Sequence, residues 1–486
     1  MNKEIVQYAS DKKMILTEDA LRLLNIYNYK QIIDNLEKEN KIFVSYNDIK
    51  KNIEELKIKN NNNANLPDIK NFFILDKYDV TGKKLSQGKV DDFLKLFIDK
   101  YNSISEIIKT RVDFEYIKIS DAQNLPKNKK VDIIGMIYEK RKSKNDNFII
   151  TVDDLSGKVS LVINSKDPKL NLEANNLLLD NVIGFKCSVL SKDMFIVNEI
   201  IYPDIPFVSK QSNLTKDTYL AVISDVHVGS KLFLEKEFLD FIDWLNFKNS
   251  EDEEIIKNLK YLVIAGDLVD GVGIYPSQFD ELLIPDIFKQ YELFEDYILR
   301  IPKNIEIFIS PGNHDAVRLS DPQPAIPETF FKRLYHENNI HLIGSPSVVE
   351  IEGYNCLIYH GSALIGIYTT LQDMNMEKPD LAIKEVLKRR DLMPQFGQKQ
   401  TFMPIEKNFM VIKQVPDIYI GGDVHTHAYS KYKGCHILNG SCWQSITNYQ
   451  IELGHHPTYA KVLLFNLKTQ KLIIKDFESK KQNIQI

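Results

Sequence analysis

Five short segments of the chain place aspartate, asparagine or histidine directly after an apolar, β-rich run. In α/β sheets, ligands gather at the carboxyl ends of strands, so five such ends can direct their polar side chains to one place. Carboxylate, amide and imidazole groups suit Mn²⁺, Mg²⁺ or iron ions better than a thiolate site would. The segments are TYLAVISDVHVGS (218–230), YLVIAGDLVDGVG (261–273), IEIFISPGNHDAV (305–317), CLIYHGSA (356–363) and DIYIGGDVHTH (417–427).

A phosphodiester is one substrate on which a pair of divalent ions at such a place could act. Two cations about 4 Å apart can bind the phosphate, create a hydroxide near neutral pH and stabilise the leaving oxygen. One D-x-H motif, or one histidine after a strand, is more often structural, so it is the ordered set of five that predicts the metal site. Glycines beside Asp267, Asn313, His360 and Asp423 let the backbone turn sharply there.

The elements that must position these segments follow from the periodicity. From about residue 216, strands alternate with helices and longer connections, which predicts an α/β layered core. Between 130 and 203 the period is two, and five short strands, the first containing a glycine, predict a small Greek-key barrel such as an OB-fold; an unspecified small β-domain is the alternative. The strands are VDIIGMIYEK, NFIITVDD, KVSLVINS, VIGFKCSVL and MFIVNEIIYP.

The chain before the barrel predicts helices and a linker. Residues 1–55 predict a small helical region, in which Thr17 caps the helix TEDALRLLNIY. Residues 56–89, with their Asn-rich run, predict a linker, and a surface loop is the alternative. An amphipathic helix is predicted over 90–111, and its apolar face carries Phe93, Leu96, Phe97 and Tyr101.

The bulk composition predicts a soluble, intracellular protein of two or three domains. Hydrophobic residues make up 43% of the 486 residues, which is ample for a sizeable core. The four cysteines form no C-x-x-C pair, and plain core residues are a better interpretation of Cys435 and Cys442 than metal ligands. No signal-type or membrane-spanning apolar run is present, so we expect a cytoplasmic location and no membrane partner.

The net charge of −5 does not indicate a free-standing nucleic-acid binder, although a local basic groove stays compatible with it. One cluster of basic residues falls on the predicted barrel, where a solvated hairpin face and a nucleic-acid surface are equal alternatives. Its members are Lys127, Lys129, Lys130, Lys140, Arg141, Lys142 and Lys144.

The ordered motifs D-x-H, G-D-x-x-D, G-N-H-D, strand-H-G and G-D-x-H resemble the calcineurin-like metallophosphoesterase superfamily. The resemblance implies two Mn²⁺ or Mg²⁺ ions in a β-sandwich flanked by helices. Asp267 would bridge the ions. Asp225, His227 and His425 would complete one ion, and Asn313, His360 and Asp423 the other.

The resemblance also implies an acid beside the metals. His314 would protonate or stabilise the leaving group, and Asp315 or Asp270 would orient it.

The last motif leaves two alignments open. The superfamily pattern is Gly-His-x-His, and here either Asp423 and His425 or His425 and His427 occupy the two ligand places. A loop that starts at the strand end Ile420 favours the first alignment, and aspartate is a competent hard-oxygen ligand. In that alignment His427 becomes a nearby substrate-binding or surface residue.

Longer strings resemble the small subunit of archaeal family-D DNA polymerase, over roughly residues 90–475. Five of them are ISDVHVGSKLFLEKEFLDFIDWLN, GDLVDGVGIYPSQ, GNHDAVRLSDPQPAIPE, VLKRRDLMPQFGQKQTFMPIEKNFMVIKQVPDI and NGSCWQSITNYQ. The resemblance implies a 3′–5′ exonuclease that proofreads DNA while a separate large subunit polymerises. It also implies docking of the large subunit through the OB-fold and the phosphoesterase domain, and a sliding clamp as a further partner.

The implied domain organisation has four parts: a helical region (1–55), a linker (56–89), a helix plus OB-fold (90–210) and a metallophosphoesterase domain (211–486). Base-stacking candidates follow two ligand segments, where ordinary loop packing is the alternative: Tyr275, Phe279 and Tyr368. Three rival functions stay open. They are a catalytically weak or inactive scaffold subunit, a phosphatase, and a double-strand-break nuclease.

Overall fold

The computed structural model describes residues 71–84, 86–207, 209–248, 252–452 and 454–478. Within the first 52 residues it describes 2–17, 20–21, 24, 29–39, 41–44, 48–49 and 51–52. The chain divides into two compact units, residues 1–71 and 72–486.

The first unit is small and mainly helical. It contains α1 (Asn2–Asp11) and α3 (Tyr29–Lys38), with β1 (Ile15–Leu16) paired in parallel with β2 (Phe43–Val44). The backbone amide of Ala20 donates to Thr17 Oγ1 at 3.3 Å, as the predicted cap requires. Several residues of the predicted helix TEDALRLLNIY lie outside the described residues.

The segment predicted as a linker divides at about residue 71. Residues 53–70, which include its Asn-rich run, lie outside the described residues. Beyond them, β3 (Phe72–Ile74) pairs antiparallel with β13 (Ser347–Ile351), and η1 (Asp76–Tyr78) follows. This strand was not predicted, because its apolar run FFIL (72–75) is too short to show a period.

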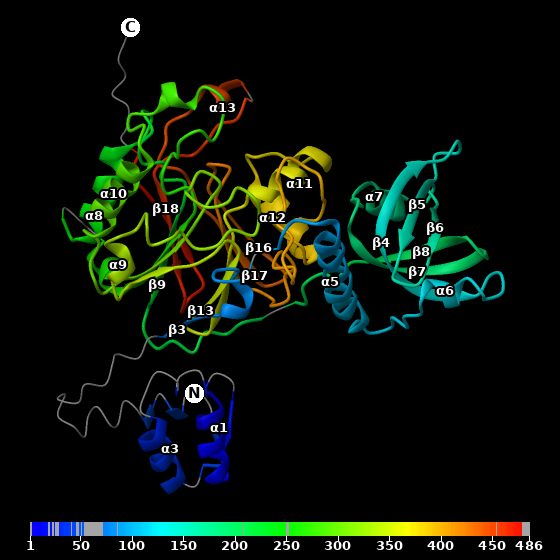
Figure 1. Cartoon of the computed structure of the whole chain (residues 1–486), viewed down its shortest axis with the longest axis horizontal. Helices are drawn as coiled ribbons and strands as arrows, with labels where there is room; N and C mark the ends of the chain where they lie inside the picture. The colour runs from blue at the N-terminus through cyan, green and yellow to red at the C-terminus, as the bar shows by residue number, and fades with distance from the viewer. Residues whose placement is uncertain are drawn as a thin grey trace. The chain divides into compact units, whose positions relative to one another are not determined.

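A helix and a closed five-stranded barrel come next (Figure 1). The predicted helix is present as α5 (Val90–Lys109), and the predicted strands are all present. The barrel order is β4-β5-β6-β8-β7, and the short helices α6 (Ile119–Ala122) and α7 (Pro168–Asn175) contact the barrel. The strands are β4 (Lys130–Lys142), β5 (Phe148–Asp153), β6 (Lys158–Ile163), β7 (Val182–Ser191) and β8 (Met194–Ile201).

The rest of the second unit is built on two six-stranded sheets. The first has the order β12-β11-β10-β9-β18-β19, and the second β16-β17-β15-β14-β13-β3. Strands of the first sheet are β9 (Tyr219–Ile223), β10 (Leu259–Ala265), β11 (Glu306–Ser310), β12 (Ile340–Leu342), β18 (Lys461–Asn466) and β19 (Leu472–Asp476). Further strands of the second are β14 (Tyr354–Ile358), β15 (Ile418–Gly421), β16 (Ala428–Tyr432) and β17 (Cys435–Asn439).

Alternation along the strands divides the core. In β9, Leu220 and Val222 join a cluster that also contains Ile358 and Ile420 of the second sheet. The neighbouring Ala221 of β9 joins a different cluster, which packs against helices of the first sheet's other face. The layered α/β core that the periodicity predicted is therefore present.

Helices cover the outer faces of the two sheets. The cluster on the first sheet includes residues of α8 and α10, and that on the second includes residues of α11 and α12. The helices are α8 (Glu235–Leu245), α9 (Glu253–Asn258), α10 (Ile287–Ile298), α11 (Ile365–Thr370), α12 (Pro379–Arg389) and α13 (Asn448–Glu452). Of the helices that the structure describes, none has the length and apolar character to cross a bilayer.

Helix α5 joins the barrel to the two-sheet core (Figure 1). Leu96 and Tyr101 of its predicted apolar face are buried, and the rings of Phe93 and Phe97 each lie 5.5 Å from the ring of Phe396. On the same helix, Lys100 forms a buried ion pair with an aspartate beyond α12, Asp391, at 2.7 Å.

Candidate binuclear metal site

The five predicted segments leave their strands at one place because the strands are parallel. In the first sheet β9, β10 and β11 run parallel, so Asp225, Asp267 and Asn313 follow at the same edge. In the second sheet β14 and β15 also run parallel, and they carry His360 and Asp423 beyond their ends. The two edges meet, because the amide of Asp423 donates to both carboxylate oxygens of Asp225 at 3.2 Å.

The backbone at this edge of the sheets is strained at several of the candidate metal ligands. A positive φ is uncommon for a non-glycine residue and persists only where the surroundings enforce it. Five candidate ligands adopt this conformation: Asp225 (53°), His227 (54°), Asp267 (52°), Asp423 (73°) and His425 (55°). Strain of this kind clusters at functional sites, which makes it an indicator independent of the motifs.

Glycines are required where the ligand loops touch. A Cβ on Gly312 would lie 2.2 Å from Asp267 Oδ1, and one on Gly266 would lie 2.4 Å from His360 Nδ1. A Cβ on Gly422 would lie 2.7 Å from Asp225 Oδ2. Side chains at these glycines would push the ligands apart.

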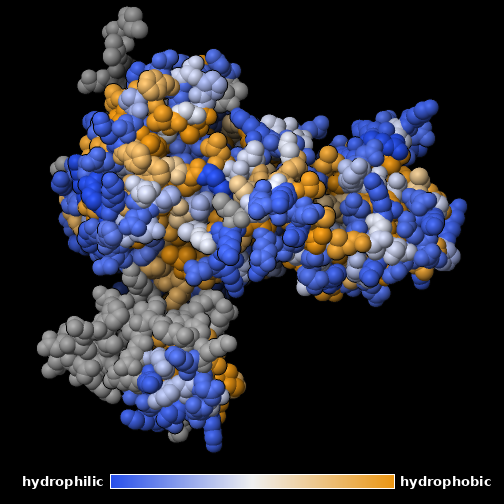
Figure 2. Space-filling model, viewed as in Figure 1, coloured by the Kyte–Doolittle hydropathy of each residue, from blue (hydrophilic) through white to orange (hydrophobic). Residues whose placement is uncertain are grey.

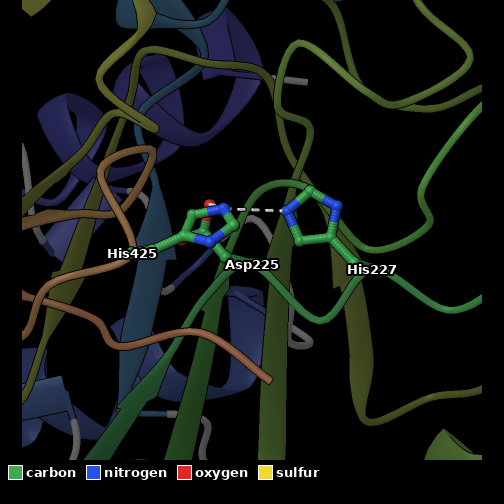
Figure 3. A group of neighbouring side chains, drawn as sticks. All are labelled: Asp225, His227 and His425. Atoms are coloured by element: carbon green, nitrogen blue, oxygen red, sulfur yellow. Dashed lines mark hydrogen bonds and ion pairs between the residues drawn. The ribbon is translucent and has the colours of Figure 1, made fainter. Parts of the chain in front are cut away.

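The first group of ligands is Asp225, His227 and His425, shown in Figure 3. His425 Nε2 lies 3.0 Å from His227 Nε2 and 3.6 Å from Asp225 Oδ1. Two imidazole nitrogens this close require a proton or a cation between them. All three side chains are buried.

Asp267 connects this group to a second one. Its Oδ2 lies 3.8 Å from His227 Nε2 and 3.3 Å from His360 Nε2. His360 Nε2 also lies 3.7 Å from Asp423 Oδ1. Asn313 Oδ1 accepts a hydrogen bond from Ser362 at 3.2 Å, in the loop that follows His360.

The residues present fit a pair of metal ions. His360 Nε2 is buried and has no hydrogen-bond partner among the residues the structure describes, while Nδ1 is 2.7 Å from the carbonyl of Ala265. The carbonyl holds a proton on Nδ1, so the Nε2 lone pair faces the site, as a metal-ligating imidazole requires. Three overlapping groups have ligand atoms within 4.8 Å: Asp225–His227–His425, His227–Asp267–His314 and Asp225–Asp267–His360.

Burial and mutual charge shift the pKa values of these groups. Burial raises the pKa of Asp225 to about 7. Burial opposes the low pKa of Asp267, but His360 and the neighbouring histidines outweigh it and hold that pKa below its usual range. Burial and the charge of His227 lower the pKa of His425 well below the usual value. A buried cluster in which pKa values diverge in this way is typical of a functional site.

The pKa values of His227 and His360 are raised by the carboxylates around them. Burial lowers the pKa of His227, but the hydrogen bond to Asp270 and the nearby carboxylates raise it to about 8. Burial lowers the pKa of His360, but the charge and hydrogen bond of Asp267, together with the charges of Asp225 and Asp423, raise it well above its usual value. The carboxylates around these two histidines thus favour positive charge at the site, and they would attract a divalent ion in the same way.

His314 lies beside the ligands, and its two candidate partners are placed differently. Its Nδ1 is 2.7 Å from the carbonyl oxygen of Asp270, and its amide donates to Asp267 Oδ1 at 2.8 Å. The Asp270 carboxylate instead accepts from His227 Nδ1 at 3.1 Å. The Asp315 carboxylate accepts from Gly312, Leu268 and Tyr291, so it braces the loop rather than the His314 ring. The Asp315 carboxylate points away from the His314 ring because it accepts a hydrogen bond from Gly312 in its own loop.

Glutamines that the motifs did not reveal hold the ligands in place. Gln450 Nε2 lies 3.0 Å from His425 Nδ1, and Gln444 Nε2 donates to Asp270 Oδ1 at 2.9 Å. Gln278 donates to the carbonyl of Asp270 at 2.7 Å. Such partners fix the orientation of metal ligands. Two of them lie in NGSCWQSITNYQ, where only the string as a whole was a signal.

The substrate-binding candidates lie at different distances from the cluster. His427 Nδ1 and its amide both contact Thr458 Oγ1, at 2.9 and 2.8 Å, which turns it away from the ligand groups. Tyr275 lies edge-on to His314, with ring centroids 6.2 Å apart. The Tyr368 hydroxyl is buried without a hydrogen-bond partner among the described residues, and the charge of Asp423 contributes, after burial, to its raised pKa. Phe279 is exposed.

Comparison with known proteins gives the family. Residues 220–431, which contain all seven candidate metal ligands, match the sequence model that describes the B subunits of DNA polymerases alpha and epsilon. The DNA polymerase II small subunit of Thermoplasma acidophilum is 32% identical over 479 residues, which cover 98% of this chain and 93% of that protein. This chain belongs to the archaeal family-D DNA polymerase small subunits.

Other small subunits of DNA polymerase II give the same result. That of Archaeoglobus fulgidus is 37% identical over 389 residues, covering 80% of this chain and 77% of its own. That of Methanothermobacter thermautotrophicus is 36% identical over 399 residues, covering 81% of each chain. The family that the sequence strings predicted is confirmed.

Proposed function

We propose that this chain is the small subunit of a two-subunit replicative DNA polymerase and removes nucleotides from the 3′ end of DNA with two divalent metal ions, Mn²⁺ or Mg²⁺. The observation that carries the proposal is the position of one oxygen, Asp267 Oδ2, between His227 on one side and His360 on the other. A carboxylate so placed can be shared by two ions.

Two ligand sets follow from this arrangement. Asp225, His227 and His425 would hold one ion together with Asp267, and Asn313, His360 and Asp423 would hold the other with the same carboxylate. When bound, the pair would supply a hydroxide and neutralise the phosphate.

His314 is our candidate acid for the leaving oxygen. A carbonyl oxygen can only accept, so the contact with Asp270 places a proton on His314 Nδ1. In the imidazolium form Nε2 carries a second proton, which it would give to the departing 3′ oxygen, leaving the neutral ring with its proton on Nδ1. Proton donation of this kind typically contributes 10²–10⁴-fold to a rate.

Preference for a mismatched end follows from access to the site. A paired terminal nucleotide must first be separated from its partner, whereas a frayed one enters directly. Tyr275 beside His314 would contact the entering nucleotides, and Tyr368 on α11, whose hydroxyl is buried, would do so through its ring. His427 would act further from the metals.

The fold supports docking of a large polymerising subunit. We interpret the two sheets as a calcineurin-like β-sandwich and the barrel as an OB-fold, because its strand order closes with β6 parallel to β8. The barrel exposes apolar side chains among charged ones (Figure 2), including Tyr138, Leu155 and Leu172, each more than 60% exposed. These exposed apolar residues are candidates for the interface with the large subunit, and a sliding clamp is a further candidate partner.

A catalytically inactive scaffold is the alternative function. A scaffold would not explain why seven candidate ligands converge, or why five of them adopt a strained backbone conformation. Such strain persists mainly at functional sites. We therefore favour an enzyme that works in the cytoplasm at the replicating DNA.

The test is cleavage of a 5′-labelled single strand by the pure chain with Mn²⁺, with and without its large subunit. We expect a ladder of products that shorten from the 3′ end, and no ladder when a chelator is present. An intact strand in both preparations would support the scaffold instead. Release of phosphate from monoesters without cleavage of DNA would support a phosphatase.

A further inference from the structure

The segment 394–403, here named the strap, connects helix α5 to the loops of the metal site. At its start the Pro394 carbonyl accepts from Lys100 at 3.0 Å, and the Phe396 amide donates to Asp180 of the barrel at 2.9 Å. Gly397 then takes a φ of 76°, which turns the chain. The strap is therefore fixed on the barrel side before it reaches the site.

The other half of the strap is fixed to the loop that follows His314. Gln400 Nε2 donates to the carbonyl of Leu319 at 2.9 Å and to Asp321 Oδ2 at 3.1 Å. Backbone bonds join Asp321 to Thr401 and to Met403. Both ends of the strap are thus held by specific contacts.

The buried carboxylate of Asp321 extends this connection to a metal ligand. Asp321 Oδ2 also accepts from the hydroxyl of Tyr359 at 2.9 Å, and Tyr359 directly precedes His360. The same hydroxyl accepts from the amide of Ala363, in the loop beyond His360. The strap is therefore packed onto the structure that positions the second ligand set.

Lys399 lies at the middle of the strap, between these two ligand loops. Its neighbour Gln398 packs against Gly366, six residues after His360, while Gln400 is bonded to the loop after His314. The Lys399 side chain is exposed. The neighbours of Lys399 on both sides thus contact loops that carry candidate ligands, which places this lysine beside the site.

The charges at the site suggest what Lys399 could bind. The four carboxylates of Asp225, Asp267, Asp270 and Asp423 equal in charge the two divalent ions that they would surround. A DNA strand brings one negative charge per nucleotide, so phosphates beside the cleaved one need cations from the protein. An ammonium on a flexible stem suits a phosphate, because it acts as a point charge that needs no fixed geometry.

We infer that Lys399 binds a backbone phosphate of the strand that enters the metal site, and that the strap holds it at the mouth for this purpose. The inference rests on the proposed exonuclease function, whose substrate contact it specifies. Lys399 acts on binding of the strand rather than on cleavage, so its loss raises KM and leaves kcat nearly unchanged.

Salt dependence of binding tests this directly. For a single strand, log Kd changes with log salt by about 0.7 for each phosphate neutralised by the protein. The probe is a labelled single strand with phosphorothioate 3′ linkages, which resist cleavage, titrated with the full chain by fluorescence anisotropy. We expect Lys399→Gln to lower the slope by about 0.7 and to weaken binding about fivefold at 0.1 M salt. Lys399→Arg retains both values.

Lys303 provides the matched control, since it precedes β11 and so lies at the opposite edge of the sheet from the site. Lys303→Gln should leave the slope unchanged. A neutral methylphosphonate at the contacted linkage should weaken binding by the wild type but not by Lys399→Gln. An unchanged slope for Lys399→Gln, with wild-type cleavage intact, overturns the inference and leaves the exonuclease standing. A wild-type chain that neither binds nor shortens DNA overturns the function itself.

Discussion

At the scale of single residues, the proposed function gives Asp267 and His314 different tasks. Asp267 contacts both ligand groups through one oxygen, and His314 directs one ring nitrogen to the Asp270 carbonyl and keeps the other for the reaction. The task of Asp267 depends on its contact with both ligand groups, and that of His314 depends on its two ring nitrogens.

Replacing either residue should remove activity without unfolding the chain. We expect Asp267→Ala to abolish cleavage and His314→Ala to lower kcat by about 10²–10⁴-fold, measured with Mn²⁺ and a labelled strand. Binding of the large subunit should be retained in both variants. Normal cleavage by either one would contradict the assignment of the site.

Asp423 can be tested by exchange for a second imidazole. The side chain lies beside His360, whereas His427 is turned to Thr458. We expect Asp423→His to preserve or raise activity and to increase affinity for Zn²⁺ relative to Mg²⁺ in calorimetric titrations, because imidazole is the softer ligand. His427→Ala should cleave nearly normally. Inactivity of both variants would favour the alignment that pairs His425 with His427.

The sequence predicted which residues converge but not all of their partners. Asp225, Asp267 and His360 were found because each follows an apolar strand, a signal that a single sequence contains. Gln450 was missed because it reaches His425 across 25 residues from a helix with no motif of its own. Asp315 was expected near the His314 ring, and the local closure of its loop directs it elsewhere.

At the scale of elements, the parallel strands converge only because glycines let their ends approach. Gly312→Ala would place a Cβ 2.2 Å from Asp267 Oδ1, with little room to relax since Asp267 is itself held in a positive φ. We expect the variant to lose about 1–3 kcal/mol of stability, as overpacked cores do. It should also lose the rise in Tm that Mn²⁺ gives the wild type.

Gly157→Ala is the matched control, because a Cβ there would meet its neighbours at 3.4 Å or more. Thermal unfolding with and without Mn²⁺ measures both effects. A Gly312→Ala chain that Mn²⁺ still stabilises fully would show that the close approach of these loops is not needed for binding.

Periodicity predicted the elements where burial alternates regularly. The barrel strands and α5 were found because one face is buried and the other is not, which leaves a period of two or of 3.6. Strand β3 was missed because three residues cannot show a period, and its partner β13 lies about 275 residues away in the sequence. Pairing over such a separation comes from tertiary contacts alone.

At the scale of the whole molecule, a buried ion pair joins the barrel's helix α5 to the core beyond α12. The Lys100 and Asp391 side chains are 4% and 2% exposed. Lys100→Met leaves the aspartate buried without its partner, so we expect a loss of about 3–5 kcal/mol in chemical denaturation. Lys257→Met breaks an exposed pair with Glu253 and should change stability by less than about 1 kcal/mol. Equal, small effects would show that this junction does not hold the two parts together.

The proposed function requires that the ends of five strands hold two metal ions. Anomalous diffraction from crystals soaked in Mn²⁺ would locate these ions. We expect two peaks on either side of Asp267, one among Asp225, His227 and His425 and the other among Asn313, His360 and Asp423. No peak at this edge of the sheets, or peaks only elsewhere on the chain, would contradict the proposed function.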